Sequence, residues 1–142
     1  MPAKNSFKRE EHLKSRKLIA ALFDSGKSVA SPFFRVLWLR SNLPLQNIPV
    51  QICISVPSGK FSAAAIRNRI KRKISEAYRT NKHELIKIIT TRHSLNPKMK
   101  SGLVLMIIYS SKVEMEFSEI EIALKEVFQK LIMDVAKSVN AA

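Results

Sequence analysis

The sequence predicts an α+β protein in which helices pack on one sheet as a two-layer sandwich. Several stretches carry apolar residues at spacings of three and four, which is typical of amphipathic helices. Other stretches are short, continuously apolar and bounded by Pro, Gly, Asn or Ser, which is typical of buried strands. Their order is helix, two or three strands, helix, strand, helix. A chain of 142 residues is long enough to form one domain with its own core.

The first expected element is a helix that follows a basic N-terminal arm. Residues 1–14 mix Pro, Asn and alternating charges, so we expect this arm to be mobile. Ser15 is the expected N-cap of the helix, and Gly26 is expected to end it. The apolar stripe of this helix comprises Leu18, Ile19, Leu22 and Phe23.

Three apolar segments predict strands. Residues 27–40 form an extended segment with apolar side chains on both alternations, so we expect it to be covered on both faces. A loop with two prolines follows at 41–49, and the next strand is expected at 50–56. Residues 103–109 are apolar without interruption, which predicts another buried strand.

The remaining segments complete the domain. We expect a second helical piece at 80–91 and a basic loop at 92–102. Ser118 is the expected N-cap of the final helix, with Glu121 at the spacing of a capping box. The domain organisation is then a flexible basic arm at 1–14, a single domain at 15–135 and a frayed tail at 136–142.

The stretch FSAAAIRNRIKRKISEAYR, residues 61–79, predicts the helix around which the chain is organised. Its apolar stripe consists of Ile66, Ile70, Ile74, Ala77 and Tyr78. Eight Lys or Arg and one acid lie between residues 60 and 82, whereas a helix built only for solubility would interleave more Glu. Asn68, Arg72 and Arg79 lie opposite the isoleucines. We therefore expect a face that binds a polyanion, the alternative being a solvated basic face without a partner.

Overall composition agrees with a nucleic-acid partner. The net charge is +14, and 46% of the residues are hydrophobic, so the chain is not a disordered basic tail. The start of the chain has no apolar segment typical of a signal peptide, and the longest apolar run is too short to span a bilayer. The single Cys53 suits a reducing compartment and is expected to be a small buried hydrophobe rather than a nucleophile. We expect a soluble, cytoplasmic protein.

The RNRIKR motif at 67–72 resembles the signature of the protein subunit of bacterial ribonuclease P. Ser55 and Val56 stand where that family ends a strand with Ser-Val before a short basic loop. The N-terminal segment FKREEHLKSRKLIAALFDSGKSV also resembles the family pattern of a basic arm, a short helix ending in Phe, a Gly and a Ser-Val. His12 departs from this pattern where the family has Arg, and Ile19 departs where an aromatic residue is common.

The resemblance implies a fold and a function. The fold is a sandwich like the second domain of ribosomal protein S5, with a left-handed β-α-β crossover, whereas general rules predict a right-handed one. The protein would be an RNA-binding cofactor of an endoribonuclease, ribonuclease P, that removes the 5′ leader from precursor tRNA. Catalysis would belong to the RNA subunit and its Mg²⁺, so no catalytic residues are expected in this chain. One protein monomer per RNA is expected, without a membrane or a small-molecule substrate.

Two sets of site residues follow from the resemblance. The expected contacts to the RNA subunit are Arg67, Asn68, Arg69, Lys71, Arg72, Lys73, Arg79 and Lys60. This prediction requires the arginines to face outward without being neutralised by the chain's own acids. The expected leader-binding cleft, between the first helix and the sheet, comprises Phe23, Ile19, Phe33, Arg35 and Leu37. The alternative for the apolar members is plain core.

Other functions remain open at this point. A ribosomal or assembly protein could use the same sandwich to bind structured rRNA without a leader cleft. A DNA-binding repressor would need a helix-turn-helix pair, and no short turn precedes the basic helix. An independent metal nuclease would need converging carboxylates, and we expect the acids between residues 114 and 121 to form a solvated face. The three histidines show no ligand spacing.

Overall fold

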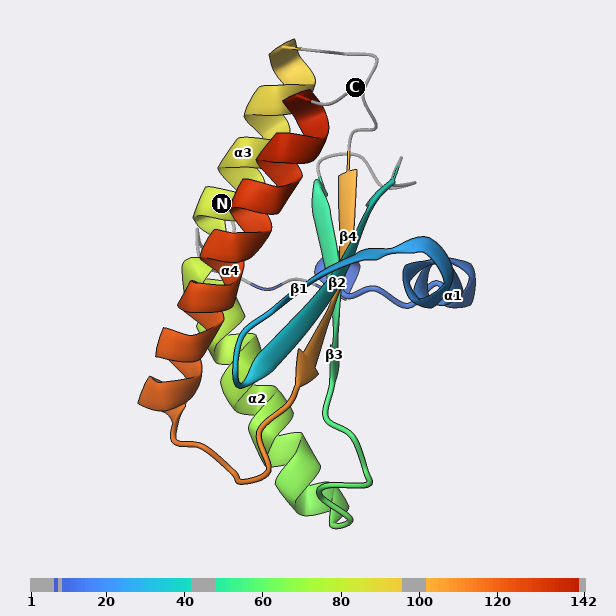
Figure 1. The fold of residues 1–142 in the computed structure, drawn as a ribbon. Helices are drawn as coiled ribbons and strands as arrows, with labels where there is room; N and C mark the ends of the chain where they lie inside the picture. Colours follow the sequence, from blue (N-terminus) through green and yellow to red (C-terminus); the bar gives the residue numbers. More distant parts are fainter. Residues whose placement is uncertain (1–6, 8, 42–47, 96–101, 141–142) are drawn as a thin grey trace.

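The computed structural model describes residues 7, 9–41, 48–95 and 102–140 and folds them into helices around one sheet (Figure 1). In chain order the elements are η1 (Arg9–Glu11), α1 (Arg16–Ser25), β1 (Lys27–Ala30), β2 (Phe34–Ser41), β3 (Val50–Ser55), α2 (Ala64–Asn81), α3 (His83–Leu95), β4 (Gly102–Tyr109) and α4 (Phe117–Asn140). This order confirms the α+β prediction. The extended segment expected at 27–40 is a hairpin of β1 and β2.

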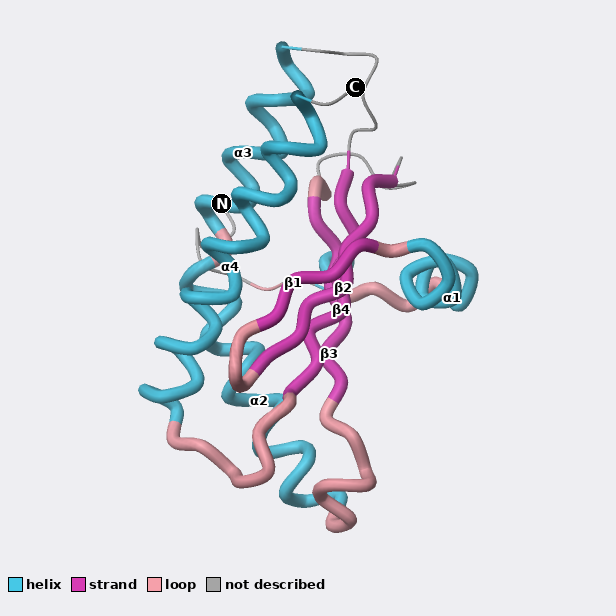
Figure 2. The backbone as a smooth tube through the Cα atoms, viewed as in Figure 1, coloured by secondary structure: helices cyan, strands magenta, loops and turns pink. Residues whose placement is uncertain are grey.

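The strands of the sheet lie in the order β1-β2-β4-β3 (Figure 2). β2 is antiparallel to both β1 and β4, whereas β3 and β4 are parallel. The chain between β3 and β4 passes through α2 and α3, which supplies the crossover that a parallel pair requires. The left hand of this crossover, implied by the family resemblance, stays a prediction.

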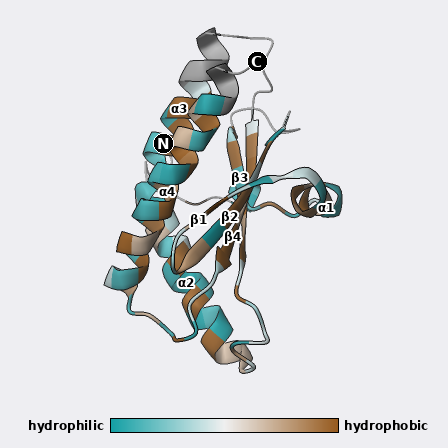
Figure 3. Ribbon diagram, in the orientation of Figure 1, coloured by the Kyte–Doolittle hydropathy of each residue, from teal (hydrophilic) through white to brown (hydrophobic). Residues whose placement is uncertain are grey.

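The two faces of the sheet are covered by different helices. Figures 1 and 3 show α2, α3 and α4 on one side and α1 alone across the other. Phe34, Val36 and Trp38 of β2 belong to the larger core under α2 and α4, and Leu37 belongs to a smaller core under α1. The two-layer core of the prediction is therefore present, and α1 adds a layer on the second face.

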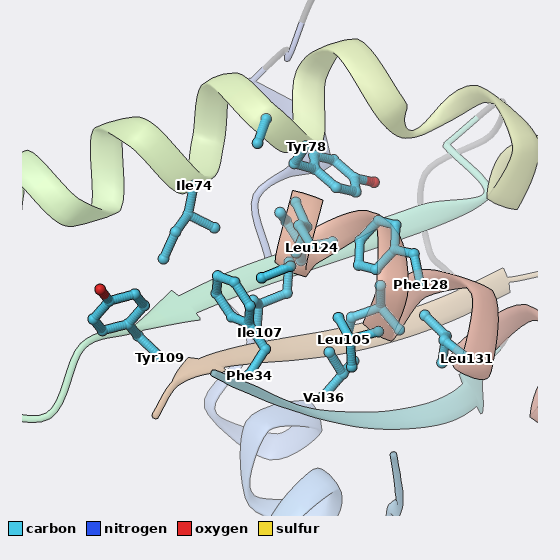
Figure 4. Close-up of a cluster of buried hydrophobic side chains, with 14 of the residues drawn as sticks. Phe34, Val36, Ile74, Tyr78, Leu105, Ile107, Tyr109, Leu124, Phe128 and Leu131 are labelled. Carbon is cyan, nitrogen blue, oxygen red and sulfur yellow. The ribbon is translucent and has the colours of Figure 1, made fainter. Parts of the chain in front are cut away.

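The apolar stripe of α2 anchors this helix, as the sequence predicts. Ile70, Ile74 and Tyr78 have 0% of their surface exposed. Figure 4 shows Ile74 and Tyr78 pointing from α2 towards side chains of α4 and the sheet. The Tyr78 ring meets Phe128 of α4 edge to face, with centroids 5.9 Å apart. Since burying one such side chain contributes roughly 1.5–3 kcal/mol, the stripe determines the rotation of α2.

The segment from Arg9 to Leu13 is packed against the fold and differs from the mobile arm expected up to residue 14. Leu13 donates its backbone N–H to the Ile52 carbonyl on β3 at 2.7 Å. The Glu11 carboxylate accepts a 2.6 Å hydrogen bond from Lys82, and these side chains are only 10% and 6% exposed. Local charge alternation suggested an arm because it cannot reveal a partner 71 residues away.

Helix α1 begins and ends as predicted. The Ser15 hydroxyl accepts the Leu18 N–H at 3.2 Å, which is the expected N-cap. At the other end Gly26 donates its N–H to the Leu22 carbonyl at 3.1 Å. A Cβ on Gly26 would lie 2.4 Å from that carbonyl oxygen, so a larger residue would force the backbone apart.

Helix α4 begins before the predicted N-cap Ser118, and that prediction is wrong. The Glu116 carbonyl accepts the first helical hydrogen bond, and the Glu119 carboxylate accepts the Glu116 N–H at 3.4 Å. The side chain that accepts a backbone N–H at this helix start therefore belongs to Glu119 and not to Glu121. The reason is tertiary, because burial of both Met115 and Ile120 places the turn into the helix at Glu116.

The ends of two other predicted segments also move. α4 continues to Asn140, whereas a frayed tail was expected from residue 136. α3 extends to Leu95, inside the loop predicted at 92–102, and residues 96–101 of that loop lie outside the described residues.

Replacing Lys82 with Met should destabilise the fold strongly. The substitution takes the buried cation away from the Glu11 carboxylate, and breaking such a pair costs on the order of 3–5 kcal/mol. Urea denaturation measures the free energy of unfolding. The matched control is Lys87→Met at an exposed position of α3, which should stay within about 0.5 kcal/mol of the unsubstituted protein. Equal stability of the two variants would contradict the prediction.

Candidate nucleic-acid interface

Burial of the apolar stripe determines the direction in which each polar side chain of α2 points. Asn68 and Arg72 are exposed on the outward side of the helix. Lys71 is half-buried and turns towards the edge of β3, where it lines a groove of about 270 Å³. Asn68 and Arg72 are thus accessible to a polyanion and Lys71 is turned to one side, and contact of the three with RNA stays a prediction.

Arg67 and Lys60 donate hydrogen bonds to backbone carbonyls, although Lys60 is exposed and Arg67 is only half-buried. The Arg67 guanidinium donates to the carbonyls of Phe61 and Ser62 at 2.7 and 2.8 Å. Lys60 donates to the Ser110 carbonyl at 2.8 Å. Arg67 thus ties the loop before α2 to the first turn of the helix, whose N-cap Ala63 has no capping side chain. Arg67 is therefore held along this loop while remaining partly exposed, and its contact with the RNA subunit stays a prediction.

Arg69 and Lys73 converge on a carboxylate from the connection between β4 and α4. Arg69 donates from Nε and Nη2 to the two oxygens of Glu114, and the Nη2 contact measures 2.6 Å. Lys73 donates to the same carboxylate at 3.1 Å. The Arg69 hydrogen bond, followed by the contact with Lys73, lowers the pKa of Glu114 to about 2. The expectation that no acid of the chain neutralises these cations is wrong here.

Arg79 is also paired, with Glu76 one turn earlier on the same helix. The hydrogen bond from Arg79 lowers the pKa of Glu76 below its usual value. Sequence spacing contained this signal, because acid and base three residues apart on a helix are neighbours. Within the described residues, three carboxylates pair with bases between residues 60 and 82, a stretch that holds eight Lys or Arg. The surface of α2 remains basic.

The expected leader-binding residues do not all lie in one cleft. Ile19 and Leu37 meet in the small core between α1 and the sheet. Leu37 is only 6% exposed, so its side chain is core and cannot contact RNA, contrary to the prediction. The alternating pattern of β2 could not show this, because α1 alone decides which residues of that face are covered.

Phe23, Phe33 and Arg35 are exposed. Phe23 and Phe33 expose 65% and 41% of their surfaces, unlike the other phenylalanines of the apolar cores. Phe23 lies near the end of α1 and Phe33 beyond the far end of β1, whose four residues span roughly 13 Å. Arg35 faces the same side of the sheet as Leu37. These side chains are accessible to a ligand but are spread over a surface rather than gathered.

Two grooves beside the edge of β3 were not predicted from the sequence. The groove that Lys71 lines is adjacent to a second one of about 490 Å³. Both are lined by His12 and Lys14 from the segment before α1. Burial, followed by the nearby charge of Lys14, lowers the pKa of His12. The only sequence signal was the basic character of residues 1–14, since the grooves exist only because this segment is docked on β3.

Cys53 agrees with its interpretation as a small apolar residue. It packs against the core under α1, and burial raises the pKa of its thiol to about 11. The thiol is therefore protonated at neutral pH and is a poor nucleophile.

The acids of the β4–α4 region form the expected solvated face only in part, since Glu116 and Glu119 are exposed but Glu114 and Glu121 have partners. Glu114 is paired as described, and Glu121 accepts hydrogen bonds from Thr80 and Asn81 of α2 at 3.4 and 3.2 Å. Among the described residues, no three His, Cys, Asp or Glu side chains are grouped so that they could hold a metal ion. In the same part of the chain, none of the helices combines the length and apolar character needed to cross a membrane.

Comparisons with known proteins agree on one family. The family model described as Ribonuclease P matches residues 7–132. The chain is 36% identical over 83 residues to the ribonuclease P protein component of Chlorobium phaeobacteroides, covering 57% of each protein. It is 34% identical over 77 residues to that of Thermotoga maritima, covering 54% of this chain and 62% of the relative. The chain thus spans 57% and 62% of the length of these curated relatives.

Solved structures share the fold. The RNase P protein of Staphylococcus aureus superposes with a TM-score of 0.62 at 20% identity, covering 85% of this chain and 94% of that structure. The RNase P protein of Thermotoga maritima gives a TM-score of 0.61 at 22% identity, covering 84% and 96%. At these identities the likeness establishes the arrangement of helices and strands.

The Glu114 ion pair should be visible in a carboxyl titration. With a pKa of about 2, against 4.5 for an ordinary Glu, its contribution to stability is present above pH 4.5 and is lost as pH falls towards 2. The ¹³C resonance of the Glu114 carboxyl should therefore titrate near pH 2. In the Arg69→Ala/Lys73→Ala variant the midpoint should rise towards 4.5. A wild-type midpoint near 4.5 would show that the pair does not form in solution.

Proposed function

Because the chain belongs to the ribonuclease P family, we propose that it binds the catalytic RNA and the precursor tRNA leader of a ribonuclease P holoenzyme. The reaction is endonucleolytic removal of the 5′ leader. The premise rests on the family match over residues 7–132, and the partners and the reaction are our proposal.

The observation that carries the proposal is the outward face of α2. Arg72 and Asn68 are exposed opposite the buried isoleucines, and Lys71 connects this face to the grooves at the edge of β3. A guanidinium can bind a phosphate through two parallel hydrogen bonds, and an amide offers a donor and an acceptor. This face therefore supplies the counter-charge and the polar groups that a folded RNA requires. The paired Arg69 and Lys73 lie to one side of it.

The leader is assigned to the side of the molecule that carries α1. Phe23 offers an exposed aromatic ring for stacking on an unpaired base, and Arg35 offers a cation for a phosphate. Phe33 extends this surface past β1. Ile19 packs α1 onto the small core, and Leu37 is buried in that core and does not contact the leader.

Hydrolysis is assigned to the RNA partner and its Mg²⁺, as the resemblance implies. The part of this chain is to neutralise phosphates and to hold the leader. Neutralisation of the phosphates stabilises the RNA complex at low Mg²⁺, because protein cations replace counterions that the RNA would otherwise need. We further propose a cytoplasmic ribonucleoprotein with one protein per RNA.

Reconstitution tests the proposed function directly. Precursor tRNA and a bacterial ribonuclease P RNA are combined at limiting Mg²⁺, with and without the protein. The expected result is release of the 5′ leader only when the protein is present. The protein without the RNA should release nothing. Failure of the protein to rescue cleavage at limiting Mg²⁺ would contradict the proposal.

Arg72→Ala should weaken binding to the RNA subunit and reduce its salt dependence. Losing one phosphate contact should lower the slope of log K against log salt by about one, with a loss of affinity on the order of tenfold. Fluorescence anisotropy at several salt concentrations measures both quantities. Lys125→Ala on α4 removes one exposed charge from a different helix and should change neither by a comparable amount. Identical slopes for the two variants would remove Arg72 from the interface.

Phe23→Ala should reduce discrimination between precursor and mature tRNA. The ring is 65% exposed, so its removal should leave the fold intact while losing a stacking contact worth about 1–3 kcal/mol. The ratio of dissociation constants for the two tRNAs, measured with the holoenzyme, should fall. Met133→Ala, at a 62% exposed position of α4, is the control for loss of a large apolar side chain. An unchanged ratio for Phe23→Ala would place the leader elsewhere.

A further inference from the structure

The carboxylate of Glu114 is seated between two cations of the proposed RNA-binding helix. It accepts hydrogen bonds from Nε and Nη2 of Arg69 and from Nζ of Lys73. The side chains of Arg69, Lys73 and Glu114 are 53%, 22% and 22% exposed, so the site opens to solvent. The carboxylate of Glu114 thus already occupies the site where α2 offers the Arg69 guanidinium and the Lys73 ammonium together.

The backbone on both sides of Glu114 is fixed by the core. The hydroxyl of the fully buried Tyr109 donates to the Val113 carbonyl and accepts the Met115 N–H at 3.0 Å. Lys73 also donates to the Met115 carbonyl at 2.9 Å. The turn therefore holds Glu114 in a fixed position beside Arg69. This ion pair differs from one between two flexible surface side chains, because its position is set by the core.

We propose that Glu114 occupies, in the free protein, the position that an RNA phosphate takes on Arg69 and Lys73. It thereby lowers the affinity of the helix for polyanions. A carboxylate and a phosphodiester offer the same kind of oxygen acceptors to a guanidinium fork, so one can replace the other. Because the turn is fixed, the exchange needs only a rotation of the Glu114 side chain. The identity of the ligand as RNA rests on the proposed function.

Charge accounts for the size and the persistence of the effect. Arg69, Lys73 and Glu114 together carry one positive charge, whereas the two cations alone would carry two. Since the pKa of Glu114 is about 2, the carboxylate stays ionised throughout the neutral range, and only another anion can displace it. An RNA that binds α2 through Arg72 must therefore compete with Glu114 for the adjacent cations.

The test compares Glu114→Gln with Glu116→Gln. Each variant removes one negative charge from the same connection, but only Glu114 is seated on Arg69, while Glu116 is exposed at the start of α4. Anisotropy measures binding to a ribonuclease P RNA and to an unrelated structured RNA. Glu114→Gln should bind both RNAs about fivefold more tightly, the range of an exposed ion pair, and Glu116→Gln less than about twofold more tightly.

A double-mutant cycle then assigns the gain to the two cations. In the Arg69→Ala/Lys73→Ala background, Glu114→Gln should increase the affinity for RNA no more than Glu116→Gln does. Thermal unfolding of each variant verifies that the fold is intact. The inference is overturned if Glu114→Gln binds no more tightly than Glu116→Gln, or if it binds more weakly, which would mean that Glu114 orients Arg69 for RNA.

The two hypotheses fail in different ways. The proposed function requires the unsubstituted protein to prefer ribonuclease P RNA over the unrelated RNA. The role of Glu114 requires only that a polyanion binds. It is judged by the ratio of the RNA affinities of Glu114→Gln and Glu116→Gln, measured with either RNA.

Discussion

Burial of Ile70, Ile74 and Tyr78 between the sheet and α4 is the contact on which the rest of the structure depends. It determines the rotation of α2, and with it the direction of every basic side chain on that helix. Arg72 and Asn68 face outward because they stand opposite this stripe. The basic surface is therefore a consequence of core packing as much as of composition.

Acidic residues from separate parts of the chain form ion pairs with some of the cations in and next to α2. Glu114 takes Arg69 and Lys73, Glu11 takes Lys82 at the end of the helix, and Glu76 takes Arg79 within it. The unequal burial of these pairs gives them different physical roles. The pair of Glu11 with Lys82 is buried and holds the N-terminal segment in place, whereas the pair of Glu114 with Arg69 lies at the surface, where another anion can compete.

The opposite face of the sheet depends on a single helix. α1 covers Leu37 and leaves Phe23 exposed near its own C-terminus. The segment before α1 runs along the edge of β3 and turns that edge into grooves lined by Lys14 and Lys71. The two parts of the interface proposed for RNA, on α2 and beside α1, are thus joined by a segment that a sequence pattern identifies only as basic.

The sequence by itself determined the order of the main helices and strands, the stripe of α2, the cap at Ser15, the stop at Gly26 and the family, because each depends on residues close together in the chain. Only the tertiary structure decided which cations are paired, that Leu37 is covered and that α4 starts at Phe117. These features depend on contacts between distant segments, such as the 45 residues that separate Arg69 from Glu114. No local period or motif encodes the distance between two side chains that only the folded core brings together.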